Sequence, residues 1–548
     1  MTDARDPQTL LAIDALARSQ ALDPCRSFII DAPAGAGKTE LLTQRFLRLL
    51  TCVDEPEEII ALTFTNKAAG EMRDRIMLSL RSAAEPPDPD TPPHKQQTWR
   101  LASAVLEQNS ERGWQLLQQP TRLRVMTLDA LSARIARQMP LLSRFGAQPA
   151  VTNDPGRYYE QAARNTLDQL EDGTEASTII EHALAYFDND AGRLQKMLVS
   201  MLARRDQWAG LAFGEYGQQD ANALALAVSN AMRALIANQL IDVVDRFPAA
   251  RQATWMAAAR YAADLSPDSP VHLLADWQHP LGTDPEDLPR WRALAELFLT
   301  KGNEPRSVYR APICIAGATH QPQRQVLLDA ITEIVASGDV ATLASIRELP
   351  DPELSNPVGE LVAALAALLR LAYTQLWLVF HQEKSVDFSE IAMRAVEAIG
   401  SDDAPGEIRE RLDYQLRHLL VDEFQDTSPL QVGLLEHLTA GWEHEPDRSI
   451  FLVGDPMQSI YRFRKADVGL FLRVRKNGLG KIRPASLQLY RNNRSHPEII
   501  DWVNTTFGQV FAPDDDIIRG AVRYEPCVAG KPAEPMAGVT IHPLITGE

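Results

Sequence analysis

The feature that most constrains the fold is a glycine-rich segment between an apolar run and an amphipathic pattern. This segment, Ala-Pro-Ala-Gly-Ala-Gly-Lys-Thr, occupies residues 32–39; the run Phe28-Ile29-Ile30 precedes it, and apolar residues recur at helical spacing over residues 40–50. Glycines let backbone N–H groups approach phosphate oxygens, and the N-terminus of a helix attracts negative charge. The order of strand, loop and helix therefore predicts a nucleotide-binding loop. The alternative is a glycine-rich turn that merely precedes a helix, and the Lys-Thr pair argues against it.

The whole loop is predicted to bind the nucleotide: Ala32, Pro33, Ala34, Gly35, Ala36, Gly37, Lys38 and Thr39. Lys38 is expected to contact the β- and γ-phosphates, and the Thr39 hydroxyl is expected to bind Mg²⁺. Ala32 stands where the general pattern has its first glycine.

A second motif ends another apolar run with two adjacent acids. His418-Leu419-Leu420-Val421 leads into Asp422 and Glu423. A carboxylate at a strand end can hold Mg²⁺ through its water shell, and its neighbour can accept a proton from attacking water. Acids commonly follow strands, so this motif alone is not specific. Phosphoryl transfer needs a phosphate cradle together with a metal and a base, and the two motifs together supply these parts.

Five short apolar runs predict the buried strands of a parallel sheet covered on both faces. They lie at residues 28–30, 59–62, 124–127, 419–421 and 450–453. Helical patterns follow the runs, and this alternation is typical of a doubly wound α/β domain. Residues 142–399 differ, because they are rich in Ala, Leu and Arg with helical periodicity. We therefore expect a helical domain inserted between two strands, with Trp208, Trp255, Trp277 and Trp291 in its core.

The 548-residue chain is long enough for several domains, and its net charge of −18 by itself argues against nucleic-acid binding. Between Ser459 and Arg494, however, Asp467 is the only acid among many basic residues. These are Arg462, Arg464, Lys465, Arg473, Arg475, Lys476, Lys481, Arg483, Arg491 and Arg494. They predict a positive local surface on an acidic body; the alternative is a set of solvated helix faces.

The four cysteines are scattered without metal-ligand spacing, which predicts reduced thiols. No stretch is expected to be long and apolar enough to span a bilayer, and the polar N-terminus does not resemble a signal peptide. A cytoplasmic protein that does not contact a membrane is therefore expected.

Several further segments, in order along the chain, resemble the motifs of UvrD-like helicases of superfamily one. Residues 422–428 resemble motif II, and the loop at 32–39 is motif I. The other matches are residues 61–72 for motif Ia, 127–131 for Ic, 453–464 for III and 492–495 for IV. The size of the helical insert, and Asp129 in place of a histidine, make the exonuclease V type (RecB and AddA) the closest match.

The resemblance implies roles for residues that the pattern alone does not assign. Gln458 and Arg494 match catalytic residues that act on the γ-phosphate with Glu423. Surface positions are the alternative for both, more so for Arg494 because motif IV is the least complete match. Asn493 stands where the family has an adenine-stacking aromatic. Tyr490 is a candidate substitute for it, and Gln8 and Gln20 are both candidates for the adenine-reading glutamine.

On the DNA side, Phe64 and Phe463 match aromatics that stack on bases, and stacking tolerates any base sequence. Core packing is the alternative for these two side chains. The resemblance implies polar DNA contacts by Thr63, Asn66, Thr127 and Arg464, mostly to the backbone.

The implied fold class is α/β: a P-loop, RecA-like parallel sheet with a large helical insert and the start of a second RecA-like domain. Residues 1–141 and 400–476 are predicted to form the first RecA-like domain, 142–399 the insert, and 477–548 the truncated beginning of the second. The chain is accordingly expected to be the N-terminal half of a longer protein.

The implied function is that of an ATP- and Mg²⁺-dependent DNA helicase or translocase subunit, moving 3′ to 5′ in double-strand-break end processing and recombinational repair. The expected partners are single-stranded DNA, duplex ends and a second helicase/nuclease subunit. The alternative is a truncated module that binds ATP and DNA without unwinding. A small-molecule kinase would also have a P-loop, but it would lack motifs Ia, Ic and III.

Overall fold

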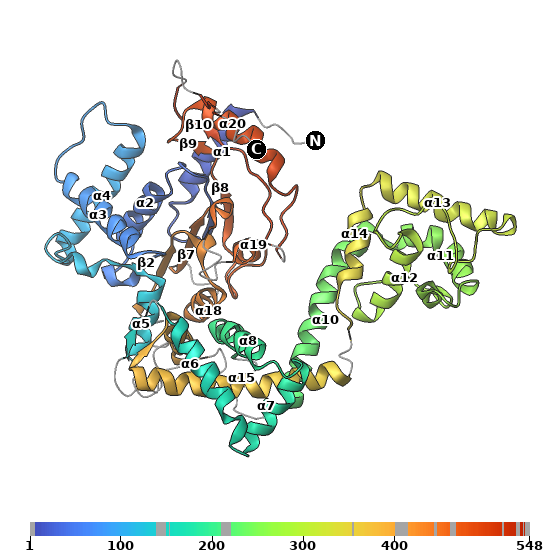
Figure 1. Ribbon diagram of the computed structural model, residues 1–548. Helices are drawn as coiled ribbons and strands as arrows, with labels where there is room; N and C mark the ends of the chain where they lie inside the picture. Colours follow the sequence, from blue (N-terminus) through green and yellow to red (C-terminus); the bar gives the residue numbers. More distant parts are fainter. Residues whose placement is uncertain are drawn as a thin grey trace. The chain divides into compact units, whose positions relative to one another are not determined.

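A computed structural model describes residues 6–138, 149–152, 154–209, 221–352, 356–400, 415–442, 447–460, 467–517, 520–532, 538–540 and 542. Two compact units divide the chain: Met1–Pro155 with Phe380–Glu548, and Gly156–Val379. The second unit thus interrupts the first in sequence, and each is described by itself (Figure 1).

The first unit is built on a six-stranded sheet of order β3-β2-β6-β7-β1-β8, in which every pair of neighbours is parallel (Figure 1). The strands are β1 Phe28–Asp31, β2 Ile59–Thr63, β3 Arg124–Thr127, β6 His418–Val421, β7 Ser449–Gly454 and β8 Ala485–Gln488. All five apolar runs form strands, which confirms the predicted α/β fold class. β8 has a mixed exposed and half-buried pattern, so it lacks the continuous apolar run that marked the others.

Alternate residues of these strands pack into two different cores. Phe28 and Ile30 belong to one core and Ile29 to the other, because successive side chains in a strand point to opposite faces. The first core contains residues of α2 Lys38–Leu50, α3 Asn66–Ser82 and α4 Pro93–Arg112. The second contains residues of α5 Leu128–Gln138, α16 Phe388–Ile399, α18 Pro429–Leu438 and α19 Val468–Asn477. Helices therefore cover both faces, as a parallel sheet requires.

The remaining described elements of the first unit are short strands and two helices. They are α1 Pro7–Gln20, β4 Ala150–Val151, β5 Ser385–Val386, β9 Arg491–Asn492, α20 Pro497–Val510 and β10 Val528–Ala529. The start of a second RecA-like domain at residue 477 stays a prediction. In the described part of that segment, β8 pairs with β1 at the edge of the main sheet.

The second unit is helical, as predicted for the insert. Its helices are α6 Gly156–Leu167, α7 Glu175–Tyr186, α8 Ala191–Ala203, α10 Ala221–Arg246, α11 Ala249–Asp264, α12 Leu288–Phe298, α13 Gln321–Ala336, α14 Val340–Ser345 and the greater part of α15 Asn356–Glu383. Trp255, Trp277 and Trp291 are buried in one core, where Trp255 lies edge-on to Phe298 at 4.8 Å between ring centroids. Trp208 is also buried. The assignment of all four tryptophans to core packing is therefore confirmed.

One helix is long and apolar enough to cross a membrane by length and composition. The segment Leu361–Glu383 of α15 has a mean hydropathy of 1.6, so the expectation that no stretch passes this test is wrong. Core helices of soluble proteins pass the same test. Leu368, Ala372 and Leu376 of this segment are buried at intervals of one helical turn, as in such a core helix.

Candidate nucleotide-binding and hydrolysis site

The glycine-rich loop connects β1 to α2 and takes a conformation that only glycine adopts easily at two positions. Gly35 has φ +74° and Gly37 has φ +82°, both in the left-handed region. A Cβ atom on Gly35 would lie 2.6 Å from Asn492 Oδ1 and 2.8 Å from Arg494 Cβ. Any side chain at residue 35 would therefore displace the segment that carries Arg494. The loop leaves the N–H groups of the first turn of α2 without helical acceptors, as at every helix N-terminus.

The loop meets the acidic motif through a direct side-chain contact. Lys38 Nζ donates to Glu423 Oε2 at 3.3 Å, although the two residues lie 385 positions apart in the sequence. Their strands run parallel, so the loops after β1 and β6 emerge at the same edge of the sheet. Ligands of open α/β sheets bind at this carboxyl edge. The two predicted halves of a phosphoryl-transfer site are thus brought together.

The acidic motif itself carries a perturbed carboxyl group and a strained residue. Burial raises the pKa of Asp422 to about 7, the adjacent Glu423 charge raises it further, and the Lys38 ammonium opposes this shift. Glu423 has φ +51°, a left-handed conformation that is unfavourable for a side chain with a Cβ atom. Its N–H donates to Asp422 Oδ1 at 3.0 Å. Strain of this kind clusters at functional sites, where the surrounding structure holds it.

Gln425, which the sequence analysis did not single out, connects the acidic motif to the strand next to it. Its Nε2 donates to Glu423 Oε2 at 2.9 Å and to Asp426 Oδ2 at 3.1 Å, and its Oε1 accepts from the Asp455 N–H at 2.9 Å. Gln425 is buried. A polar residue between two acids at a strand end was the available signal, but only the fold shows which groups it joins.

Gln458 lies on the same edge of the sheet, in the turn after β7. Its exposed side chain donates to the Asp455 carboxylate. Burial raises the pKa of Asp455, while the Lys38 charge and the bond from Gln458 lower it. The electrostatic effect of Lys38 on Asp455 indicates that the turn carrying Gln458 faces the phosphate loop.

Arg494 belongs to a segment that is anchored to the loop by its backbone. Asn493 N–H donates to Gly35 O at 2.8 Å, and Asn492 Oδ1 accepts from the N–H groups of Arg494 and Ser495 at 2.9 Å each. The Arg494 side chain is exposed. The backbone is therefore fixed beside the loop, and the guanidinium can move.

The adenine side remains a prediction. Tyr490, the candidate for stacking, is only 8% exposed. Gln8 and Gln20 are both exposed on α1. Two other residues of α1, Asp14 and Arg18, approach the loop instead, and the sequence analysis missed both.

The residues predicted to contact DNA begin at the ends of two neighbouring strands. Thr63 of β2 pairs with Thr127 of β3, so the two side chains that close these strands lie at the same edge. Thr63 Oγ1 donates to Thr65 O at 3.1 Å, and Thr127 Oγ1 accepts from the Ala130 N–H at 3.1 Å. Both threonines are buried and hold local turns, which is a structural role compatible with their order in the motifs.

Phe64 is half-buried and Asn66 is exposed at the start of α3. Phe463 and Arg464, like Arg462 and Lys465, lie outside the residues that the structure describes. Contacts of all these residues with DNA stay predictions.

The predicted positive surface is partly neutralised by acids from other segments. Arg475 contacts Asp31 Oδ2 at 3.2 Å and also binds the Asp515 carboxylate. Arg473 lies 3.8 Å from Glu436, and Arg483 donates to a backbone carbonyl. Counting charges along the sequence missed these pairs because their acidic partners lie outside the basic stretch.

Burial raises the pKa of Asp31 to about 7, nearby Asp455, Glu525 and Asp515 add to the effect, and Arg475 opposes it. Folding therefore favours the protonated form. The stability from this group is greatest below its ordinary pKa of 3.8 and is lost as pH rises toward about 7. In urea unfolding across this range, Asp31→Asn should lose less stability than wild type, by roughly 1 kcal/mol per pH unit. Asp276→Asn, which changes an exposed carboxylate, should follow the wild type; parallel curves for wild type and Asp31→Asn would contradict the prediction.

A divalent cation fits the donors of this site. Thr39 offers a hydroxyl and Asp422 a carboxylate, and Mg²⁺ is commonly bound by few protein oxygens together with phosphate oxygens and water. Among the described residues, no group of three or more His, Cys, Asp or Glu forms a metal cage, which is consistent with that sparse coordination.

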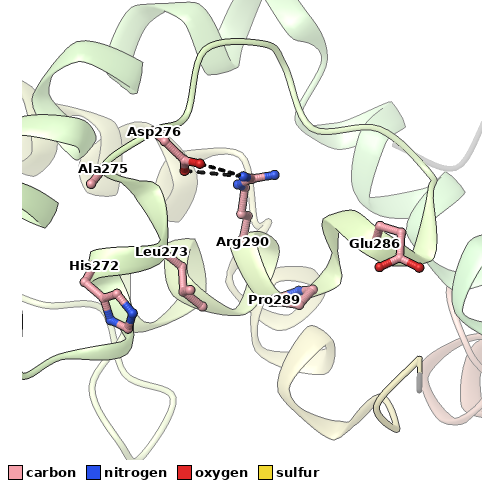
Figure 2. Close-up of a pocket in the computed structure, with 7 residues that line it drawn as sticks. All are labelled: His272, Leu273, Ala275, Asp276, Glu286, Pro289 and Arg290. Carbon is pink, nitrogen blue, oxygen red and sulfur yellow. Dashed lines mark hydrogen bonds and ion pairs between the residues drawn. The ribbon is translucent and has the colours of Figure 1, made fainter. Parts of the chain in front are cut away.

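A separate pocket lies in the helical unit. Figure 2 shows Arg290 directed at Asp276, with a contact of 3.2 Å, while His272, Leu273, Ala275, Glu286 and Pro289 form the rest of the lining. Its only arginine is thus already engaged by a carboxylate. None of the predicted nucleotide-binding residues belongs to this unit.

Comparisons with known proteins agree with the motif matches. A protein-family model described as the UvrD/REP helicase N-terminal domain matches residues 15–262 and 338–478. Similar curated proteins are named as ATP-dependent helicase/nuclease subunits of the AddA type. The one from Desulfitobacterium hafniense strain Y51 is 26% identical over 94% of this chain and 37% of its own length. Those from Moorella thermoacetica and Bacillus velezensis are 25% and 24% identical, covering 93% and 88% of this chain and 36% and 38% of their own lengths. The chain therefore spans little more than a third of these relatives.

Proposed function

Because this chain belongs to the UvrD/REP helicase family, whose N-terminal domain model covers more than half of it, we propose that it binds ATP with Mg²⁺ and couples hydrolysis to movement on DNA. The observation that carries the proposal is the contact between Lys38 and Glu423. It joins a phosphate-binding loop to a carboxylate that can act as a base, at the ligand-binding edge of a parallel sheet.

The residues divide the work of in-line attack by water on the γ-phosphorus. Lys38 moves from Glu423 to the phosphates when ATP binds, which frees the carboxylate. Glu423 then accepts a proton from the attacking water, the bond from the γ-phosphorus to the bridging oxygen breaks, and ADP leaves. Arg494 stabilises charge on the transferring group, and Gln458 contacts the γ-phosphate. Mg²⁺ held by Thr39 and Asp422 would neutralise phosphate charge.

DNA binding is proposed at the ends of β2 and β3 and in the turn after β7. Phe64 and Phe463 stack on bases, and Thr63, Asn66, Thr127 and Arg464 contact the strand. The names of the relatives support work on double-strand-break ends with a second subunit, by 3′-to-5′ movement in the bacterial cytoplasm.

A second candidate is a module that binds ATP and DNA without unwinding. The exposed Arg494 favours it, because an arginine that stabilises a transition state must be brought onto the phosphate by closure of the site. In this case nucleotide would bind while turnover stayed at background.

The test is ATP hydrolysis with and without single-stranded DNA. A motor should hydrolyse ATP faster when DNA is added, and its DNA affinity should fall steeply with salt because basic residues neutralise phosphates. Nucleotide binding without DNA-stimulated hydrolysis would favour the second candidate. A flat salt titration would count against the basic surface.

A further inference from the structure

Two residues of α1 form a pair that none of the helicase motifs contains. Arg18 Nε donates to Asp14 Oδ2 at 2.6 Å, and Arg18 Nη2 lies 3.3 Å from Asp14 Oδ1. Asp14 is 2% exposed, so its charge is buried and depends on the groups that surround it. The spacing of four residues places both side chains on one face of the helix.

Arg18 also contacts the nucleotide-binding loop. Its Nη2 donates to Ala36 O at 2.7 Å. The peptide plane that contains this carbonyl also contains the Gly37 N–H, which points the opposite way because the peptide is planar and trans. In the described part of the chain, the Gly37 N–H has no hydrogen-bond partner. Arg18 therefore fixes the direction of a backbone donor in the loop predicted to bind phosphate.

Asp14 holds the segment on the other side of the loop. Its Oδ1 accepts from the N–H groups of Tyr490 at 2.9 Å and Arg491 at 3.1 Å. These residues lead into Asn493, which binds Gly35 O, and Arg494, which lies against Gly35. The segment carrying Arg494 is thus tied to the loop directly and again through the Asp14–Arg18 pair.

The two ties make the pair well suited to control geometry. Neither side chain can move without releasing a bond to the loop or to the 490–494 segment. The loop is also the part of the site that most needs help, since left-handed glycines allow many backbone conformations. Charge-assisted bonds from rigid α1 would remove that freedom before nucleotide arrives.

From this geometry we infer that Asp14 and Arg18 are positioning residues that hold the nucleotide-binding loop and the 490–494 segment in the arrangement that binds ATP. This inference rests on the proposed function. It adds α1 to the nucleotide site through side chains that act on the protein backbone.

The experiment measures the affinity of the full chain for a fluorescent ATP analogue. Arg18→Lys keeps the charge but lacks the planar fork that reaches both Asp14 and Ala36. Asp14→Asn keeps an acceptor for the two backbone N–H groups and loses the charge that orients Arg18. Each variant should bind roughly ten- to a hundredfold more weakly. The double variant should be no weaker than the poorer single variant, because either change breaks the same connection.

A matched control separates positioning from loss of stability. Arg251 in the helical unit forms a similar pair, with its Nη1 2.7 Å from the mostly buried Asp339. Arg251→Lys should lower the melting temperature without changing ATP affinity. All affinities are measured well below every melting temperature, so that a smaller stability cannot lower the folded fraction.

The outcomes distinguish this inference from the proposed function. If the wild type does not bind the analogue, or Lys38→Ala binds as well as the wild type, the proposed function itself fails. If Lys38→Ala loses binding while Arg18→Lys and Asp14→Asn keep wild-type affinity, only the positioning role is overturned. Additive losses in the double variant, or an equal loss in Arg251→Lys, would also overturn it.

Discussion

Replacing Glu423 with glutamine is expected to slow ATP hydrolysis roughly 10²- to 10⁴-fold while ATP still binds. Glutamine has nearly the same shape, but its amide cannot accept the proton of the attacking water. The amide oxygen can still accept from Gln425 Nε2, so the local hydrogen bonds can survive. Lys38 loses its carboxylate partner, which leaves the ammonium free for phosphate. ATP affinity should therefore stay equal to that of the wild type or increase.

Steady-state hydrolysis in the natural protein that carries this chain measures the first effect, and analogue binding measures the second. Glu436→Gln is the matched control, because Glu436 lies on α18 of the same unit and only approaches Arg473. This control should hydrolyse ATP at the wild-type rate. Normal turnover by Glu423→Gln would exclude Glu423 as the base, and loss of ATP binding would indicate a structural defect.

Replacing Lys38 with alanine is expected to weaken ATP binding about a hundredfold or more, because bonds between charged groups and two phosphates disappear together. Lys38 is the first residue of α2, and its side chain is largely buried against the acidic motif. The substitution also leaves Glu423 without its cation, so the carboxylate would repel the incoming phosphates. Both effects lower affinity.

A fluorescent ATP analogue titrated into the 548-residue chain measures this loss. Lys95→Ala provides the control, because Lys95 is exposed in the first turn of α4. It should bind the analogue as the wild type does. A melting curve for each variant verifies folding, and an unchanged affinity in folded Lys38→Ala would remove the loop from the nucleotide site.

Patterns within short stretches were sufficient for the sheet and for the main parts of the site. The runs that became β1, β2, β3, β6 and β7 are continuous and apolar because both faces of a parallel sheet are buried. The loop at 32–39 was recognisable because its glycines, lysine and threonine act through their own backbone and neighbours. β8 was not predicted because an edge strand with half-exposed residues has no such run.

Other features depended on contacts between segments far apart in the sequence. Lys38 and Glu423 meet only because β1 and β6 both pair with β7. Asp14 reaches Tyr490 across the sheet edge, and Arg475 of the basic stretch is neutralised by Asp31 and Asp515. A count of charges along the chain cannot detect such pairs, because their energies depend on distance and burial.

The sequence by itself determined the type of chemistry, since the residues that bind phosphate and accept a proton lie in short motifs whose local order is sufficient. Only the tertiary structure decided which distant groups hold those motifs in place. Gln425, Asp14 and Arg18 have no distinctive local pattern, and their roles arise from the backbone groups that folding brings within hydrogen-bonding distance. Because a hydrogen bond depends on distances of a few ångströms, that part of the site exists only after the sheet has formed.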